Sequence, residues 1–505
     1  MSGAREVAAV VAFAAACGGT AGRYVVPRHA IAAARGAPDV TSVVDLGDLG
    51  AIPSEGPLPP ADADGRFAVG ELVLIAGDDF GKLPTVRIGG RPATVEARVD
   101  GGGIVARIPP GVPAGPVRVE VSHAGGRDGM TIRVDRYALV APPGGGELRV
   151  LRDVGDGQLA PVGSLAVQGA VDVAFSPDGQ AAYALSTSPP ALAVIAPTAA
   201  GGPRVVRRLS LPATLRSPRW LAVAADAPVA AVVGASFAAV VDLSDPRTPA
   251  LYRPFSLRPR PHAVVPRAAA IAPDGRTLVT LVAETNQLRV YDIADPASAT
   301  VARTIDVLPD AREPLARAMT LSPEGDRAWV VTGDSERTLA AGRHPIQLVA
   351  LPLGQGEQPP PPARVAAAGA PLAIAAARRT APPGTAIRSA ARAALAIVAV
   401  VDAGWLPAAR RPWRDAGDGG PAAVLRVNLE GEAQPLWASP GPVTAVALSH
   451  DARSVVAVYA QRAPGGGALG VAVVPIAGGD PRTVGLGPLP TAVRPLDSAA
   501  LALAP

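Results

Sequence analysis

Short runs of apolar residues, separated by turn-forming residues, recur along most of the chain. One unit reads RAAAIAPDGRTLVTLVAETNQLRVYDIADP over residues 267–296. It opens with a nearly all-apolar run, passes through APDG and continues with two further apolar runs. Proline suits the first central position of a turn, and glycine suits a position with positive φ. The pattern therefore predicts three successive strands, joined by a hairpin turn and then by a loop.

This unit returns at a nearly constant spacing. Its turn acid recurs at Asp178, Asp226, Asp274, Glu324 and Asp451, and the first three steps are 48, 48 and 50 residues. Such a period built from short strands predicts a β-propeller. The apolar runs of 371–402 supply a further blade. Residues 489–505 resemble only the first two strands of a blade, which strands from 137–154 would complete. The count over 137–505 is then seven blades; six or eight blades, or an open solenoid, are the alternatives.

Residues 68–135 carry a different pattern of alternating strands between Gly, Asp and Pro clusters. The runs are 71–75, 84–88, 93–99, 103–108 and 116–122. They predict a small β-sandwich. Residues 21–67 include IPSEGPLPPADADG and show no apolar period, so we expect a linker there.

Two resemblances accompany these patterns. LIAGDDFG, VRIGGRPATV and IVARIPPGVPAGPVRVEV resemble the IPT/TIG immunoglobulin-like domain, which implies a spacer or adhesive module. The repeats that carry SPDG resemble YVTN-type propellers, a group with lactonase-like and surface-protein relatives. SPDG is a turn signature, so it identifies architecture better than activity. The expected fold class is all-β, with an Ig-like β-sandwich followed by a β-propeller.

The N-terminal segment MSGAREVAAVVAFAAACGGT places Arg5 before an apolar run and then Cys17, the one cysteine of the chain. It resembles an export signal ending in a bacterial lipobox, with Ala14 where leucine is usual. The resemblance implies export signal 1–20, lipidation of Cys17, and a place in the cell envelope, either in the periplasm or at the outer membrane surface. Membrane contact would occur only through this lipid anchor. An ordinary secretion signal and a chain that is not exported are the alternatives.

Charge and histidine content narrow the chemistry. The net charge is only +4, so the sequence predicts no nucleic-acid partner. All basic residues except Lys82 are arginine. The five histidines are scattered without metal-ligand spacing, and no nucleophile-elbow motif is present, so we expect no metal, no cofactor and no catalytic residue.

The candidate site follows from the repeat alignment. Seven residues before the turn acid stand Val171, Arg219, Arg267, Arg317, Leu372, Thr444 and Pro490. Three consecutive blades thus offer arginine at one face of the propeller, near its channel. The residues expected at this mouth are Arg219, Arg267, Arg317, His262, Glu284 and Asp334. Convergent guanidiniums would bind an anionic small molecule or glycan. Alternatively, Arg267–Glu284 and Arg317–Asp334 are rim ion pairs of little consequence for stability.

Trp405 and Trp413 stand among three arginines in the expected surface loop 405–420, which suits a partner contact or a loop folded onto its own aromatics. The predicted function is an exported cell-envelope binding or scaffold protein. Its partners would be envelope or surface proteins, or an anionic small molecule or glycan. The alternative is a lactonase-like hydrolase acting on an acidic or lactone substrate in the channel, so enzymatic activity is left open, with recognition favoured. A purely structural adhesin is a third possibility.

Overall fold

The computed structural model describes most of the chain. The described residues are 25–26, 36–47, 56–57, 66–99, 103–143, 146–153, 155, 158–196, 203–215, 217–257, 265–282, 285–308, 315–333, 346–354, 356, 359, 362–365, 370–378, 394–401, 422–427, 432–449, 453–463, 466–488 and 500–503.

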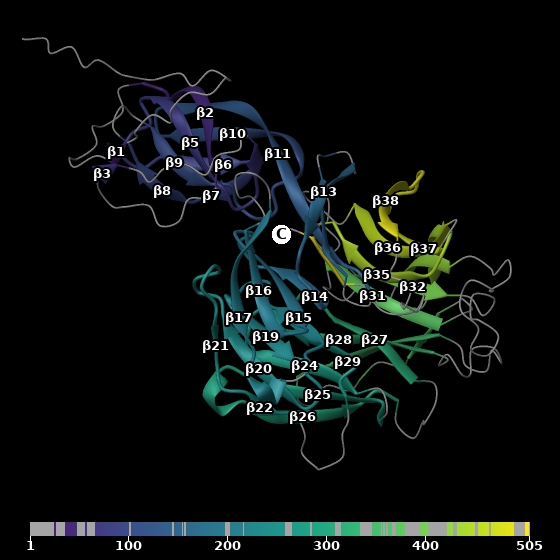
Figure 1. Cartoon of the computed structure of the whole chain (residues 1–505). Coiled ribbons are helices and arrows are strands. Elements are labelled where there is room, and N and C mark those ends of the chain that lie inside the picture. The colour runs from purple at the N-terminus through teal and green to yellow at the C-terminus, as the bar shows by residue number, and fades with distance from the viewer. Residues whose placement is uncertain are drawn as a thin grey trace, which may run out of the picture. The chain divides into compact units, whose positions relative to one another are not determined.

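Within these ranges the chain is built of β-strands (Figure 1), and its helical segments are short 3-10 turns such as Ala213–Leu215 and Pro296–Ser298. The chain divides into two compact units. One holds residues 1–136 and 197–203, and the other holds 137–196 and 204–505. The expectation of an all-β protein is confirmed.

The first unit contains two sheets that contribute to one core. The first sheet runs in the order β2 (Asp39–Gly47), β5 (Leu72–Asp78), β9 (Ile104–Arg107) and β8 (Val95–Arg98). The second contains β7 (Arg91–Ala93), β6 (Thr85–Ile88), β10 (Gly115–His123) and the first part of β11 (Gly126–Ala141), with β4 (Phe67–Ala68) parallel to β11. Ile75 of one sheet and Val119 of the other are fully buried in the shared core.

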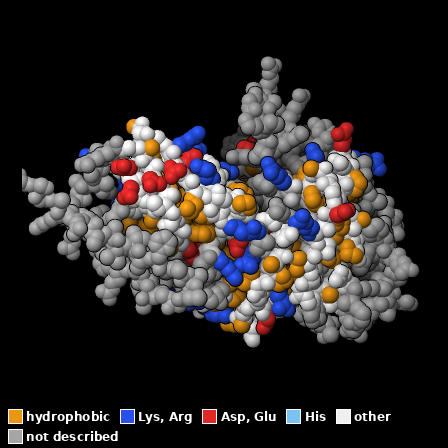
Figure 2. Space-filling view, turned by 90° about the horizontal axis from the view of Figure 1, so that it is seen from above, with side chains coloured by type: hydrophobic (Ala, Val, Ile, Leu, Met, Phe, Trp, Pro, Cys, Tyr) orange, Lys and Arg blue, Asp and Glu red, His pale blue; other side chains and the backbone are white. Residues whose placement is uncertain are grey.

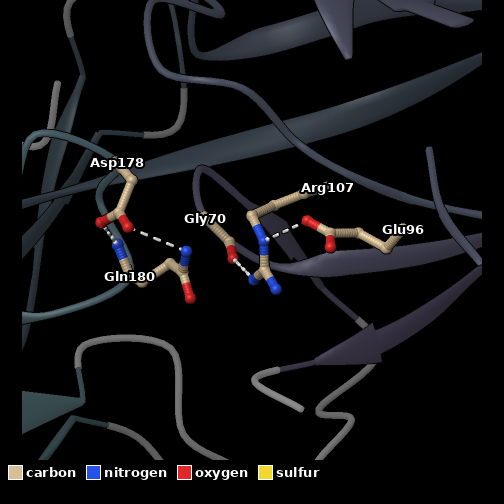
Figure 3. A network of polar contacts seen from close by, with 5 residues as sticks. All are labelled: Gly70, Glu96, Arg107, Asp178 and Gln180. Carbon is tan, nitrogen blue, oxygen red and sulfur yellow. Dashed lines mark hydrogen bonds and ion pairs between the residues drawn. The ribbon is translucent and has the colours of Figure 1, made fainter. Parts of the chain in front are cut away.

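Polar contacts fasten the first sheet of this unit. Arg107 on β9 donates to the carbonyl of Gly70 (2.7 Å) and to Glu96 Oε1 (3.2 Å), as Figure 3 shows. Arginine is thus used here to tie strand ends together.

Strand β2 lies inside the segment expected to be a linker. It pairs with β5 over nearly its whole length, with register shifts at Val40/Ser42 and Asp45/Gly47. These two irregularities interrupt the period-2 alternation, and for that reason the sequence pattern hides the strand.

The second unit is a series of antiparallel sheets, each with consecutive strands in sequence order (Figure 1). The sheets are β14 (Ala170–Phe175), β15 (Ala182–Thr187), β16 (Pro190–Ala196) and β17 (Arg204–Ser210); β18 (Trp220–Val223), β19 (Val229–Val233), β20 (Phe237–Asp242) and β21 (Ala250–Leu251), with β22 (Phe255–Ser256) also on β20; β23 (Ala268–Ile271), β24 (Thr277–Val282), β25 (Gln287–Asp292) and β26 (Thr300–Asp306); β27 (Leu315–Leu321), β28 (Arg327–Gly333), β29 (Gln347–Pro352) and β30 (Ala363–Arg364); β31 (Ala370–Arg378), β32 (Ala394–Val401), β33 (Ala422–Val427) and β34 (Ala433–Ser439); and β35 (Val443–Leu448), β36 (Ser454–Ala463), β37 (Gly466–Pro475) and β38 (Arg482–Pro488).

One further sheet joins distant parts of this unit. Strand β39 (Ala500–Leu503) pairs with β11, Leu503 opposite Ala138, and β12 (Leu148–Asp153) and β13 (Leu159–Leu165) follow on the other side. Along the described chain, contacts join the first strands in the order β14, β18, β23, β27, β31 and β35, and β39 contacts both β35 and β14. The second unit is therefore a β-propeller.

The way this last sheet is assembled differs from the expectation in one respect. The described part of 489–505 supplies a single strand, β39, which is innermost, and the second strand is β11 rather than a C-terminal one. The expected inner strand near residue 490 lies outside the described residues.

The repeated turn behaves as predicted. Gly179, Gly275 and Gly325 have φ between 73° and 74°, the left-handed region that glycine adopts readily. In the first copy, Asp178 accepts hydrogen bonds from the backbone N–H (3.0 Å) and side-chain amide (2.9 Å) of Gln180 (Figure 3). Asp274 accepts in the same way from the N–H of Arg276 (3.0 Å), so the acid stabilises the turn in these two copies.

Candidate functional site at the start of the inner strands

The aligned column that begins with Val171 corresponds to one backbone feature. The register of β14 shifts between Ala170 and Asp172, and equivalent shifts occur in β27, β31 and β35. The extra residues are Val171, Arg317, Leu372 and Thr444. An extra residue at the start of a strand is a β-bulge, which turns neighbouring side chains in new directions.

Arg219 and Arg267 occupy the same place in their blades. The N–H of Arg219 donates to the carbonyl of Val233 (2.8 Å), next to the pair Trp220–Val233. The N–H of Arg267 donates in the same way to the carbonyl of Leu281 (2.7 Å). Spacing alone therefore located a shared structural position in six blades of the described unit.

The three predicted arginines nevertheless have different surroundings. Arg219 is exposed and lines a pocket. Arg267 extends to the next blade, where its Nε donates to the carbonyl of Arg317 (3.1 Å). Arg317 is only 7 % exposed, and neither it nor Arg267 lines that pocket. The structure therefore does not gather the arginines around one described pocket.

The other predicted residues cannot be placed. His262, Glu284, Asp334, Pro490, Trp405, Trp413 and Cys17 all lie outside the described residues. The expected ion pairs Arg267–Glu284 and Arg317–Asp334 and the expected partner contact of the 405–420 loop consequently stay predictions.

The pocket beside Arg219 has a volume of about 460 Å³ and lies between the starts of β14, β18 and β39. Its wall includes the carboxyl of Asp172, the hydroxyls of Thr187 and Ser217 and the guanidinium of Arg219. Its apolar wall includes Val171, Trp220 and Leu501. A mainly apolar pocket of this size with a few polar groups suits a small organic molecule.

The residue that directly follows the bulge position in each inner strand distinguishes the blades around the pocket from the other described blades. The corresponding residues are Asp172, Trp220, Ala268, Ala318, Ala373 and Ala445. Four described blades thus have alanine at this position. The two large or charged replacements stand in adjacent blades, and both line the pocket.

Asp172 is fixed by backbone groups of two blades. Its Oδ1 accepts from the N–H of Val173 (2.9 Å) in its own strand, and its Oδ2 accepts from the N–H of Leu221 (2.7 Å) in the next inner strand. Burial raises the pKa of Asp172 to about 7, although both N–H groups act in the opposite direction. Both charge states are therefore populated near neutral pH.

Trp220 reaches forward in a similar way. Its Nε1 donates to the carbonyl of Pro266 (3.2 Å), which precedes the inner strand of the next blade. The ring is half-buried and packs against the core between the sheet that begins with β18 and the sheet that begins with β23. It therefore presents a firmly held apolar surface to the pocket.

Asp172 and Trp220 were not among the predicted site residues. The signal that could have found them is the column directly after the arginines, in which aspartate and tryptophan interrupt a run of alanines. Reading that column requires the bulge register, because one residue of error exchanges the two faces of a strand.

Metal sites and membrane-spanning helices are both absent from the described part of the chain. There, no group of three or more His, Cys, Asp and Glu side chains could hold a metal ion. No helix among those residues is long and apolar enough to cross a membrane. On the face shown in Figure 2, cationic side chains lie at several separate places among apolar and uncharged ones.

Comparisons with known proteins yield structural similarity only. No known family and no curated protein matches the sequence. A solved structure described as a candidate 6-phosphogluconolactonase from Bacteroides fragilis is 13 % identical with a TM-score of 0.48, and the match covers 73 % of this chain and 98 % of that one.

Two further solved structures broaden the range. The β-propeller domain of Cps50 from Myceliophteria thermophila is 13 % identical with a TM-score of 0.41, over 64 % of this chain and 88 % of that one. An auxiliary nutrient binding protein from Bacteroides thetaiotaomicron is 11 % identical with a TM-score of 0.37, over 78 % of this chain and 92 % of that one. The propeller assignment rests on the sheets of the chain itself. The lactonase and nutrient-binding descriptions belong to the other proteins.

Proposed function

We propose that this chain is an exported cell-envelope binding protein that recognises a small molecule at the pocket between β14, β18 and β39. The observation that carries the proposal is the replacement of alanine by Asp172 and Trp220 at adjacent positions of one structural column. A fold that needed only a closed ring would accept alanine there, as four other described blades do. Arg219 at the exposed rim would contact an anionic group of the ligand.

The same proposal includes the finer architecture. The chain of contacts from β14 to β39 and back supports seven blades. The two sheets and common core of the first unit support an IPT/TIG-like sandwich that serves as a spacer. Envelope or surface proteins remain the alternative partners of this platform.

Pocket binding is tested by a small-molecule screen that follows tryptophan fluorescence and thermal stability. Ligands that shift the wild type should lose most of their effect in Trp220→Ala. Tyr252→Ala changes an exposed aromatic residue outside the pocket and is the matched control. Hits that bind wild type and Trp220→Ala equally would contradict a site at this pocket.

Export and anchoring are tested separately. In a bacterium with a lipoprotein pathway, wild type should gain a diacylglyceryl mass and fractionate with membranes, and Cys17→Ala should do neither. An unmodified soluble wild-type product would contradict the anchor without affecting the pocket.

A lactonase-like hydrolase is the second candidate, and one observation favours it. A carboxyl whose pKa is raised to about 7 can exchange a proton with a substrate near neutral pH. Lactone hydrolysis by wild type that falls at least about a hundredfold in Asp172→Asn would favour this function over recognition alone. Equal rates in the two proteins would count against it.

A further inference from the structure

We propose that the ligand of this pocket is a small zwitterion of the amino-acid type with an apolar side chain, its ammonium on Asp172 and its carboxylate on Arg219. The inference rests on the proposed binding function and specifies the class of ligand. It uses three chemical features of the pocket: one acid, one base and an apolar wall.

Among the described residues, backbone donors occupy part of the acceptor capacity of Asp172. An ionised carboxylate has about four acceptor positions, and the backbone bonds from Val173 and Leu221 occupy one on each oxygen. Those two bonds also hold the carboxylate in place. The remaining positions suit a donor from the ligand, and an ammonium supplies both donors and the opposite charge.

Burial makes a cationic partner more favourable here than at an exposed acid. Burial deprives the ionised form of Asp172 of part of the solvation that it would have in water, which raises the pKa to about 7. A nearby positive charge has the opposite effect, because it stabilises the ionised form. Among the residues that line the pocket, Arg219 is the one other charged side chain, and it is exposed.

The two charged groups lie within reach of one small molecule. Asp172 Oδ2 is 2.7 Å from the backbone nitrogen of Leu221, and Arg219 lies two residues before Leu221, directly ahead of β18. Two extended residues span about 7 Å, and the flexible arginine side chain can shorten that distance. The ammonium and carboxylate of an α-amino acid lie closer together than this span.

The apolar wall indicates what the rest of the ligand resembles. Val171, Trp220 and Leu501 come from three different strands, and they add hydrocarbon and an indole ring to the pocket wall. A branched aliphatic or aromatic side chain would replace water at these surfaces, which favours binding in proportion to the apolar area buried.

Three probes with one shared apolar body test the proposal by calorimetry: L-leucine, isopentylamine, which lacks the carboxylate, and isocaproate, which lacks the amine. L-leucine should bind wild type at least about tenfold more tightly than either probe with a single charge. Asp172→Asn and Arg219→Gln should each weaken L-leucine binding about tenfold or more, whereas Arg253→Gln, an exposed control outside the pocket, should not.

The role of Asp172 has a signature of its own. Because the ammonium needs the ionised carboxylate, L-leucine should bind about tenfold more weakly at pH 6 than at pH 8, and at pH 7 about half a proton should be released on binding. In Asp172→Asn both effects should vanish. A role in positioning strands alone would leave wild type and variant with the same proton release.

Other outcomes would overturn the inference without ambiguity. Isocaproate binding as tightly as L-leucine would mean an anion site on Arg219, and isopentylamine binding as tightly would mean that the carboxylate is irrelevant. If none of the three binds while screening yields other ligands that depend on Trp220, the zwitterion is wrong and the binding function stands. If no ligand of any class depends on the pocket, both fail.

Discussion

The junction between β14 and β18 and the junction between β23 and β27 solve the same structural problem with different chemistry. At the first, Asp172 Oδ2 accepts from the N–H of Leu221 (2.7 Å). At the second, Asn286 Oδ1 accepts from the N–H of Ala316 (2.8 Å). Each side chain satisfies a backbone donor of the following inner strand, which would otherwise be buried without a partner.

The difference lies in where the linking side chain stands and whether it can ionise. Asn286 is 3 % exposed, is neutral at every pH and comes from the loop before β25. Asp172 stands in the inner strand itself, lines a pocket and titrates near neutral pH. At the first junction both carboxylate oxygens accept a backbone N–H, and an amide, with one acceptor oxygen, would satisfy only one of the two.

The comparison is tested most severely by Asn286→Ala, which should lower the free energy of unfolding by about 2 to 3 kcal/mol at every pH. The change leaves the N–H of Ala316 without its acceptor and places alanine at a φ of 50°. Urea denaturation at two pH values measures the loss.

Asn286→Gly is the matched control. It also removes the amide but tolerates the positive φ, so it should be about 1 kcal/mol more stable than the alanine variant. If both variants unfold like wild type, the buried amide does not hold the second junction.

At the first junction, the effect of Asp172→Asn should depend on pH. The folded-state pKa of about 7 lies above the ordinary value of 3.8, so the protonated form favours folding. This contribution is fully present below about pH 4 and is lost as the pH rises through 7. Between pH 5 and pH 8, wild type should therefore lose about 1 to 2 kcal/mol relative to the asparagine variant, since the carboxyl keeps some contact with solvent.

Parallel denaturation curves of wild type and Asp172→Asn over this range check the expectation. Asn286→Ala provides the contrast, because its effect should not change with pH. A constant difference between wild type and Asp172→Asn would mean that the carboxyl is already ionised at pH 5, and the contrast between the junctions would disappear.

The smallest expected change in stability distinguishes Arg267 from Arg219, which occupy the same position in neighbouring blades. Arg267→Ala should destabilise the protein by about 1 kcal/mol, because Arg267 Nε donates to the carbonyl of Arg317. Arg219→Ala should change stability by less than about 0.5 kcal/mol, because its exposed side chain, unlike that of Arg267, makes no hydrogen bond to a neighbouring blade among the described residues. Equal losses in the two variants would show that the column has one structural role throughout.

The sequence predicted the repeated hairpins and the propeller because both depend on local chemistry. Glycine after a proline-containing turn and apolar inner strands leave a periodic trace, and Gly179 and Gly275 show the φ that this trace implies. Outer strands leave a weaker periodic pattern in the sequence. β26 is mostly exposed and mixes polar with apolar residues, and it was not predicted.

The candidate site was predicted only in part, and the reason is register. Arg219 was found because its column could be counted from a conspicuous turn. Asp172 stands in the adjacent column, and its significance depends on a bond to Leu221 in another blade, which no spacing within one repeat contains. Contacts between blades depend on how neighbouring sheets pack, and a single sequence does not encode that packing in a readable pattern.

The pairing of β39 with β11 has a consequence for how the protein is made. Leu503 and Ala138 are partners in one sheet, yet almost the whole propeller is translated between them. On the ribosome, β11 has one edge unpaired while the sheets from β14 to β38 are synthesised, and such an edge can pair with another chain. Ring closure joins residues of very large sequence separation, so it should come late and slowly. The edge of β11 is therefore open to wrong pairing for as long as β39 has not been made, and it closes when β39 emerges and pairs with it.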